Sequence, residues 1–304
     1  MLVQEKVLSK DLLYVYPQWH LVSFSIVAKK HIEFLRRLGA QVQDLDELYF
    51  QGFVPSKRYS VLMHPAIYVM HRILQSRTNI LGERRREYLD WWRGLFDELV
   101  GFEVADSDRL SEYAVEILNS LDKVIAPSSF VRDVMASSGV RSRIYVVPHG
   151  VEPEYYTIPS IWESAPATAI NPAILDLFLY KLRRGVKIIL FFLWHSAERK
   201  GWEEVRETYR RLRSIRSDVV LVLKTMSPRS TEFLEVADLG AIEIYGWLDE
   251  TSKIALYDLS DIVLVFSRGG GFELNALESL ARGIPTLTND FGCFTDYVPE
   301  FLRV

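Results

Sequence analysis

The stretch SRGGGFELNALESLARGIPT (267–286) contains three consecutive glycines, Gly269 to Gly271. They separate the apolar run before the stretch from a segment whose apolar residues have helical spacing. Glycine lets the backbone approach a ligand closely, and the free N–H groups at the start of a helix favour an anion such as phosphate. Arg268 adds a cation suited to phosphate. Glycines between a strand and a helix also serve as plain turns, and no Walker A or G-x-G-x-x-G pattern accompanies them. The stretch therefore leaves an anion site and a simple chain reversal open.

Two glutamates lie on the helical segment that follows the glycines. Glu273 stands at its start, where the helix dipole favours an acid, and Glu278 stands on its second turn among leucines. A carboxylate in an apolar setting needs a partner or a ligand. Glu278 is therefore either a ligand contact or a glutamate of the solvent face. Glu273 is either a ligand contact or a plain helix-start acid.

The elements that must hold these residues alternate between strand-like and helical segments. In the first half, strand-like runs occur at 12–16, 60–63, 98–102, 123–126 and 144–147, with helices near 23–39, 65–75, 84–97, 107–119 and 128–138. In the second half, strand-like runs occur at 186–194, 219–224, 242–246, 261–266 and 284–288, with helices near 202–216, 230–238, 250–258 and 273–282. Strands separated by helices predict right-handed crossovers and mostly parallel sheets. The apolar strands of the second half are typical of a sheet covered on both faces.

A proline-rich stretch interrupts this alternation in the middle of the chain. It contains Pro148, Pro153, Pro159, Pro166 and Pro172. Aromatic residues within it favour an ordered connection between domains over disorder. We place the boundary at about residue 150, which gives domains 1–150 and 151–304. The predicted fold class is α/β, with two facing doubly wound domains and a cleft between them, and ligands of such sheets bind just beyond the carboxyl ends of strands.

Length and composition narrow the class of protein. The chain has 304 residues, of which 49% are hydrophobic and 25% charged, enough for two domains with separate cores. It has no apolar run of the roughly 18 residues that span a bilayer, and its N-terminus lacks the apolar core and cleavage site of a signal peptide. A single cysteine excludes an internal disulfide, and no Cys/His cluster has metal-ligand spacing. The single cysteine favours a reducing, cytoplasmic compartment. The net charge of −4 offers no basic footprint for nucleic acid.

Several segments, taken in order, resemble the GT-B glycosyltransferases, especially family 4. LESLARGIPT (277–286) is similar to the second half of the Glu-x7-Glu motif of that family and the Ala-x-Gly-x-Pro that follows it. Glu278 stands at the second glutamate, whereas Gly270 stands where the first is expected. Further segments resemble the family in the same order, so the resemblance covers about residues 110–300: DKVIAPSSFVRDVMASSGVRSRIYVVPHGVEPEYY (122–156), HSAERKGWEEV (195–205) and YGWLDETSKIALYDLSDIVLVFS (245–267).

The resemblance implies two Rossmann-like domains, the N-terminal one on the acceptor side and the C-terminal one binding a nucleotide-sugar. It implies that Arg199 and Lys200 bind the donor diphosphate and that Glu278 binds the ribose hydroxyls. Lys224, at a strand end, is either a further donor contact or a structural lysine. Arg268 either contacts phosphate or pairs with an acid, for which Asp290 and Asp296 are the candidates.

The sugar end of the donor site departs from the family pattern. Because Gly270 replaces the first glutamate of the motif, we expect Glu273, or the backbone N–H groups of Gly270 and Gly271, to touch the transferred sugar. Family members usually continue past the position of Val304, so the resemblance also implies a second domain that lacks its usual final helices.

The activity that the resemblance implies is retaining transfer of a hexose from a nucleotide-sugar to a glycan, a lipid-linked or a protein acceptor. We expect no cofactor and no metal, because basic residues and a helix start can stabilise the leaving diphosphate and no Asp-x-Asp motif follows a strand-like run in the second half of the chain. The sequence leaves two alternatives open. One is a non-catalytic nucleotide-sugar-binding or scaffold protein, and the other is a nucleotide-sugar epimerase of the same fold.

The acceptor side is less distinctive. The loop after the first strand, YPQWHLVSFS (16–25), lacks the glycines common in the family, and Trp19 in it is either a buried loop aromatic or a stacking surface for a sugar. Asp106 either contacts acceptor hydroxyls or caps a helix, and Asp108 is expected to cap the helix that starts near Arg109. ERRREYLDWWRGLF (83–96) is either an amphipathic surface for anionic lipid, with peripheral membrane contact, or a helix whose aromatic residues pack inward.

Overall fold

The chain forms two compact units, Met1–Pro148 and His149–Val304. The structure is a computed structural model and describes residues 11–20, 22–81, 85–164, 170–194 and 196–304. Each unit has its own parallel sheet and its own core.

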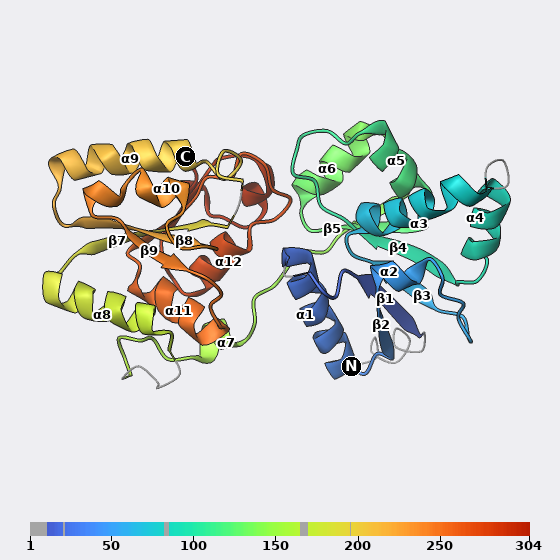
Figure 1. Cartoon of the computed structure of the whole chain (residues 1–304), viewed down its shortest axis with the longest axis horizontal. Helices are drawn as coiled ribbons and strands as arrows, with labels where there is room; N and C mark the ends of the chain where they lie inside the picture. The colour runs from blue at the N-terminus through green and yellow to red at the C-terminus, as the bar shows by residue number, and fades with distance from the viewer. Residues whose placement is uncertain (1–10, 21, 82–84, 165–169, 195) are drawn as a thin grey trace. The chain divides into compact units, whose positions relative to one another are not determined.

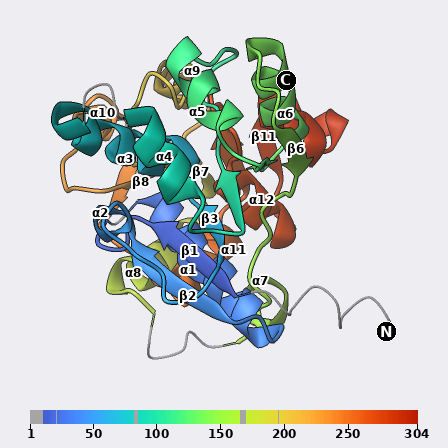
Figure 2. The ribbon, with the colours of Figure 1, turned by 90° about the vertical axis from the view of Figure 1, so that its right-hand side faces the viewer.

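The first unit is built on a parallel sheet with the strand order β2-β1-β3-β4-β5-β6. Its strands are β1 (Leu12–Tyr16), β2 (Val42–Asp46), β3 (Ser60–Met63), β4 (Glu98–Phe102), β5 (Lys123–Ala126) and β6 (Arg143–Val146). Figure 2 shows β1, β2 and β3 side by side, and β1 pairs in register with both neighbours. The strand order reverses at β1, so the loops that follow β1 and β3 flank the switch point of this sheet.

Helices cover both faces of the first sheet because the strands are apolar on both sides. Its helices are α1 (Ser23–Arg37), α2 (Glu47–Phe50), α3 (Ala66–Leu81), α4 (Arg85–Arg93), α5 (Glu112–Asn119) and α6 (Ser129–Ser138). In β1, Leu13 and Val15 pack in the larger core with α3, whereas Tyr14 and Tyr16 point to the other face and pack against α1.

The second unit has the strand order β11-β10-β7-β8-β9, again parallel. Its strands are β7 (Lys187–Leu193), β8 (Val219–Thr225), β9 (Ile242–Tyr245), β10 (Ile262–Val265) and β11 (Thr286–Thr288). The chain leaves β7 toward β8 on one side and returns from β9 to β10 on the other. The switch point of this sheet therefore lies between β7 and β10, where a doubly wound sheet binds its ligand.

Alternate residues of β7 face opposite layers of helices. Ile188 and Leu190 share a core with α8, α11 and α12, and Ile189 and Phe191 share one with α9 (Figure 1). The helices of this unit are α7 (Glu154–Thr157), α8 (Pro172–Arg184), α9 (Trp202–Ile215), α10 (Thr231–Leu234), α11 (Glu250–Leu259) and α12 (Leu274–Ala281), with short 3₁₀ helices at Ala237–Leu239, Gly292–Asp296 and Glu300–Leu302.

The expected alternation of elements is present. The expectation missed β2, α8, the one-turn helices α2 and α7 and the two 3₁₀ helices after β11, and it placed one helix over 230–238, which is α10 followed by a 3₁₀ turn. Among the described residues, no helix is long and apolar enough to cross a bilayer. Cys293 is buried as a free thiol, and burial raises its pKa to about 12.

Candidate functional site

The candidate site lies in the second unit, at the carboxyl ends of β7 and β10. The loop after β7 carries Arg199 and Lys200, and the loop after β10 carries Arg268 and the glycines. These two loops flank the switch point of the sheet, which is the position that favours a ligand in a doubly wound fold. The fold thus brings Arg199 and Lys200, which the sequence predicted to bind diphosphate, next to the glycine loop.

One backbone hydrogen bond and one side-chain hydrogen bond tie the two loops to each other. The Arg268 amide donates to the Arg199 carbonyl at 2.7 Å, and Arg199 Nη1 donates to the Gly269 carbonyl at 2.5 Å. Gly201 has φ +76°, and a Cβ on it would lie 2.3 Å from the carbonyl oxygen of Phe266. Only glycine permits both this backbone conformation and this close approach, so Gly201 fixes the first loop against the end of β10.

Lys200 and Glu273 form a partly buried ion pair that joins the two loops. Lys200 Nζ lies 2.6 Å from Glu273 Oε1 and 2.8 Å from Oε2, and the glutamate is 5% exposed. Glu273 is the N-cap residue of α12, but its side chain makes no capping hydrogen bond. Tyr297 Oη donates to the Glu273 carbonyl at 3.0 Å and holds the residue in place. The carboxylate is thus directed into the loop rather than along the helix start.

Gly270 leaves room for that carboxylate. A Cβ built on Gly270 would lie 2.4 Å from Glu273 Oε1, closer than real Cβ contacts come. The acidic group of residue 273 therefore fills the space that a side chain at residue 270 would need. Gly270, which stands where the first glutamate of the motif is expected, thus lies directly against the carboxylate of Glu273.

Glu278 is buried, so the alternative of a glutamate on the solvent face is wrong. It is 6% exposed and accepts hydrogen bonds from Lys253 Nζ at 2.9 Å and from Tyr257 Oη at 2.7 Å. Burial raises the pKa of Glu278, and the Lys253 ammonium opposes that rise. Neither Lys253 nor Tyr257 was identified from the sequence, because both lie on α11 within an ordinary helical pattern.

Lys224, the next-to-last residue of β8, is a buried cation bonded to backbone carbonyls. Its ammonium donates to the Thr225 carbonyl at 3.0 Å and to the Gly246 carbonyl. Burial lowers the pKa of Lys224 to about 8. The ammonium also lies 5.4 Å from the ring centroid of Trp194, which meets the exposed Trp247 edge to face. The sequence did not single out these two tryptophans.

Arg268 forms its ion pairs with α9 and with the preceding loop. It bonds Glu204 and lies 4.0 Å from Glu198. The pairing considered with Asp290 or Asp296 is therefore wrong, and Asp290 instead pairs with Arg303 at 2.7 Å. A phosphate contact by Arg268 stays a prediction.

The predicted acceptor-side residues lie in exposed loops of the first unit. Asp106 follows β4 as an exposed side chain. The expected cap by Asp108 is wrong, because α5 starts at Glu112 and Ser111 caps it by accepting from the Ala114 amide at 3.2 Å. Trp19 is 75% exposed, so its interpretation as a buried loop aromatic is also wrong.

A buried carboxyl that the sequence did not reveal follows β4 directly. Glu103 accepts from the Ile67 amide at 2.6 Å and from the Val104 amide at 2.9 Å. Burial raises its pKa to about 7. Because Ile67 lies in the first turn of α3, Glu103 ties the end of β4 to the start of that helix.

The segment proposed for lipid contact packs two of its aromatic residues inward. Trp92 and Phe96 are buried in the core beside Phe50, whereas Trp91 is exposed. Arg84 and the side chains of Arg85 and Arg86 lie outside the described residues. Membrane contact by this segment stays a prediction.

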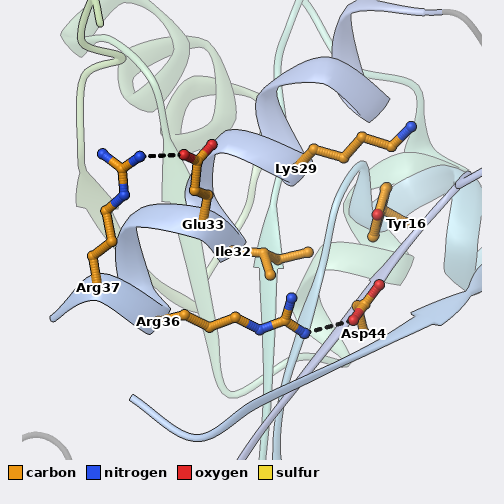
Figure 3. A pocket seen from close by; sticks show the side chains of 7 residues that line it. All are labelled: Tyr16, Lys29, Ile32, Glu33, Arg36, Arg37 and Asp44. Atoms are coloured by element: carbon orange, nitrogen blue, oxygen red, sulfur yellow. Dashed lines mark hydrogen bonds and ion pairs between the residues drawn. The ribbon is translucent and has the colours of Figure 1, made fainter. Parts of the chain in front are cut away.

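The first unit also holds a pocket of about 500 Å³ between α1 and the strands β1 and β2 (Figure 3). Arg36 bonds Asp44 at 2.7 Å and Arg37 bonds Glu33 at 2.5 Å, so two of its three cations are neutralised by acids of the same pocket. It is lined by Tyr16, Lys29, Ile32, Glu33, Arg36, Arg37 and Asp44. The sequence-predicted site residues do not line it, and we leave it out of the candidate site. Across the described part of the chain, no cluster of three or more His, Cys, Asp or Glu side chains could hold a metal ion.

Sequence comparison shows similarity to a family of glycosyl transferases and to two viral proteins. The profile of a family described as "Glycosyl transferases group 1" matches residues 186–300. "Uncharacterized protein 356" of Sulfolobus islandicus rod-shaped virus 1 is 30% identical over 297 residues, which cover 97% of this chain and 78% of that protein. "Putative glycosyltransferase 45" of Sulfolobus islandicus filamentous virus (isolate Iceland/Hveragerdi) is 25% identical over 217 residues, which cover 68% of this chain and 54% of that protein.

Solved structures share the architecture at low sequence identity. An alpha,alpha-trehalose-phosphate synthase (UDP-forming) from Burkholderia vietnamiensis superimposes with a TM-score of 0.62 at 12% identity. The superposition covers 94% of this chain and 84% of that one.

Proposed function

The chain belongs to the glycosyl transferases group 1 of the GT-B class, and on that basis we propose that it moves a hexose from a nucleotide-sugar to an acceptor with retention of anomeric configuration. The two parallel sheets covered by helices, together with the likeness to solved structures, confirm the expected GT-B fold of two Rossmann-like domains. The donor site of this proposal is the pair of joined loops at the switch point of the second unit.

One observation carries the proposal: Arg199 and Lys200 meet the glycine loop and the start of α12 at the carboxyl ends of β7 and β10. Breaking the glycosidic bond leaves a negative charge on the departing diphosphate. Preorganised cations and the N–H groups of a helix start stabilise such charge most where it develops. We assign Arg199 and Lys200 to the diphosphate, and no metal or other cofactor is needed in this scheme.

Glu273 is assigned to the transferred sugar. Its carboxylate fills the space beside Gly270, the residue that stands where the family motif has its first glutamate. Lys200 donates to both carboxylate oxygens, so the group is held in place before a sugar arrives. Lys200 would then contact both the diphosphate and the acid that orients the sugar, which couples recognition of the two halves of the donor.

Glu278 is assigned to the ribose and Lys224 to the donor phosphates. Asp106 and the exposed Trp19 are assigned to the acceptor, whose class the proposal leaves as a glycan, a lipid-linked or a protein acceptor. A lipid-linked acceptor would bring the protein to the membrane surface. What supports Lys224 is its place at the carboxyl end of β8, beside the switch-point strand β7.

We expect proton uptake when a nucleoside diphosphate binds near Lys224. Burial lowers the pKa of Lys224 to about 8 in the free protein, and a nearby phosphate favours the charged form and raises that pKa. The affinity for the nucleoside diphosphate is then highest below about pH 8, and it falls as the pH rises through the pKa that Lys224 has in the complex. Calorimetry at about pH 8.5 in two buffers of different ionisation enthalpy measures the uptake. Lys224→Arg, which stays charged, should bind without it, and equal uptake by the two proteins would remove Lys224 from the site.

The proposal is tested by incubating the chain with UDP-, GDP-, ADP- and dTDP-hexoses and measuring the released nucleoside diphosphate. Slow release into water, with the released sugar retaining its configuration by NMR, is the result expected of a retaining transferase without its acceptor. A changed free sugar would instead indicate an epimerase, and binding without release would indicate a scaffold protein. Turnover should persist in EDTA, whereas loss in EDTA that Mg²⁺ or Mn²⁺ restores would overturn the metal-independent scheme.

A further inference from the structure

A buried ionic network lies behind Glu278. Lys253 Nζ on α11 lies 2.9 Å from Glu278 Oε1 and 3.2 Å from Glu250 Oε2, and Tyr257 Oη on the same helix donates to Glu278 Oε2 at 2.7 Å. Glu250 also accepts from Tyr155 Oη at 3.0 Å. Each oxygen of Glu278 is thus held by one donor from α11, which fixes the orientation of the carboxylate.

Lys253 is the cation that balances this network. One ammonium faces two carboxylates, and its other neighbour is the ring of Tyr155, whose centroid lies 5.7 Å away. The phenols of Tyr155 and Tyr257 have pKa values raised by burial, so they stay protonated and donate to Glu250 and Glu278 as neutral groups. Neither phenol can therefore replace the charge of Lys253.

The remaining charges packed around α12 are paired elsewhere. Arg282 binds both oxygens of Asp258 at 2.8 Å, and Glu273 is occupied by Lys200. Within the described residues, no cation other than Lys253 pairs with Glu278. Burial raises the pKa of Glu278 and Lys253 is the largest influence that lowers it, so loss of Lys253 favours the protonated acid.

The protonation state of Glu278 matters for what it can hold. An ionised carboxylate only accepts, with about four lone-pair directions on its two oxygens, so each oxygen can take one more hydrogen bond beyond the donor that holds it. Two neighbouring hydroxyls of a ribose are donors that match this arrangement. A protonated carboxyl loses an acceptor at one oxygen and presents a hydrogen there instead.

We infer that Lys253 is a positioning residue of the donor site, which keeps Glu278 ionised and oriented to accept two hydrogen bonds from a ribose. The inference rests on the proposed role of Glu278. Lys253 contacts the glutamate, so in this assignment its replacement acts on the nucleotide through the charge of Glu278.

The test measures binding of UDP, GDP, ADP and dTDP to the full chain by calorimetry across about pH 6 to 9. Lys253→Gln keeps a side chain of similar length without the charge, Lys253→Arg keeps the charge, and Glu278→Gln removes the acid. For the nucleotide that the wild type binds most tightly, Lys253→Gln should weaken binding about tenfold at low pH and recover toward wild type as the pH rises. Lys253→Arg should bind within about threefold of wild type at every pH, which loss of folding or of packing would not reproduce.

The outcomes separate this inference from the proposed function. If Glu278→Gln binds every nucleotide as the wild type does, the donor-site assignment itself is wrong. If Glu278→Gln weakens binding at all pH values while Lys253→Gln binds with the wild-type pH profile, only the role of Lys253 is wrong. An infrared carboxyl band that appears in ligand-free Lys253→Gln, and disappears in Lys253→Gln with Glu278→Gln, reports the protonated acid directly. Absence of that band at low pH in folded Lys253→Gln also overturns the inference.

Discussion

A chain carrying Lys200→Met together with Glu273→Gln should turn over at least about a hundredfold more slowly than a chain carrying Glu273→Gln alone. Lys200 is placed to stabilise the charge that develops on the leaving diphosphate, and loss of one such preorganised donor typically costs about 10²–10³ in kcat. Both chains carry Glu273→Gln because Lys200→Met alone would leave the buried Glu273 carboxylate without its partner, which destabilises the fold. Steady-state kinetics of nucleoside diphosphate release provides the measurement.

The matched control for this experiment lies on the same strand. Lys187 is at the amino end of β7 and pairs with Asp261 at 3.0 Å, away from the carboxyl end that carries the site. Lys187→Met should therefore leave kcat and nucleotide affinity within about twofold of wild type. Unchanged kcat and unchanged nucleoside diphosphate affinity in the Lys200 variant, relative to Glu273→Gln, would contradict the diphosphate assignment.

Glu273→Gln is expected to lower kcat by about a hundredfold while the affinity for free nucleoside diphosphate stays within about twofold of wild type. Because the carboxylate is assigned to the sugar, its loss should not change the affinity for a nucleoside diphosphate, which carries no sugar to be transferred. Gly270→Ala should reproduce much of the effect, because the added Cβ would lie 2.4 Å from Glu273 Oε1 and must displace it. Turnover of each variant with the preferred nucleotide-sugar, beside calorimetry with the diphosphate, separates the two parameters.

A chain with both Gly270→Ala and Glu273→Gln tests this explanation. If Gly270→Ala acts by moving the Glu273 carboxylate, adding it to Glu273→Gln should lower kcat little further, since the effects of residues that act as a unit are not additive. Wild-type turnover by Glu273→Gln would show that the acid serves only as the partner of Lys200. In that case the backbone N–H groups of the glycine loop would have to recognise the sugar.

The second sheet could be predicted from the sequence almost strand by strand. Its strands are buried on both faces, so they appear as continuous apolar runs such as VVLVLK, which is β8 without its last residue. β2 was missed because VQDLD alternates with polar residues and is partly exposed at the edge of the first sheet. α8 was missed because Pro172 was counted with the connecting stretch, although proline is favoured at the first position of a helix.

The candidate site was predictable only in part, for a physical reason. The glycine loop, Glu273 and Glu278 are recognisable because they are close together in the sequence. Their pairings are not recognisable: Lys200, although named as a diphosphate residue, pairs with a residue 73 positions away, and Lys253 pairs with one 25 positions away. Such contacts depend on where the ends of parallel strands and the faces of packed helices meet, which spacing along the chain does not encode.

The buried thiol of Cys293 makes this protein a favourable background for site-directed labelling. It is the sole sulfhydryl of the chain, and at neutral pH it stays protonated and shielded from reagents. Maleimide or spin-label chemistry would then modify only cysteines introduced on purpose at exposed positions. One label in each unit would report the distance between the units while donor and acceptor bind, with the native cysteine left in place.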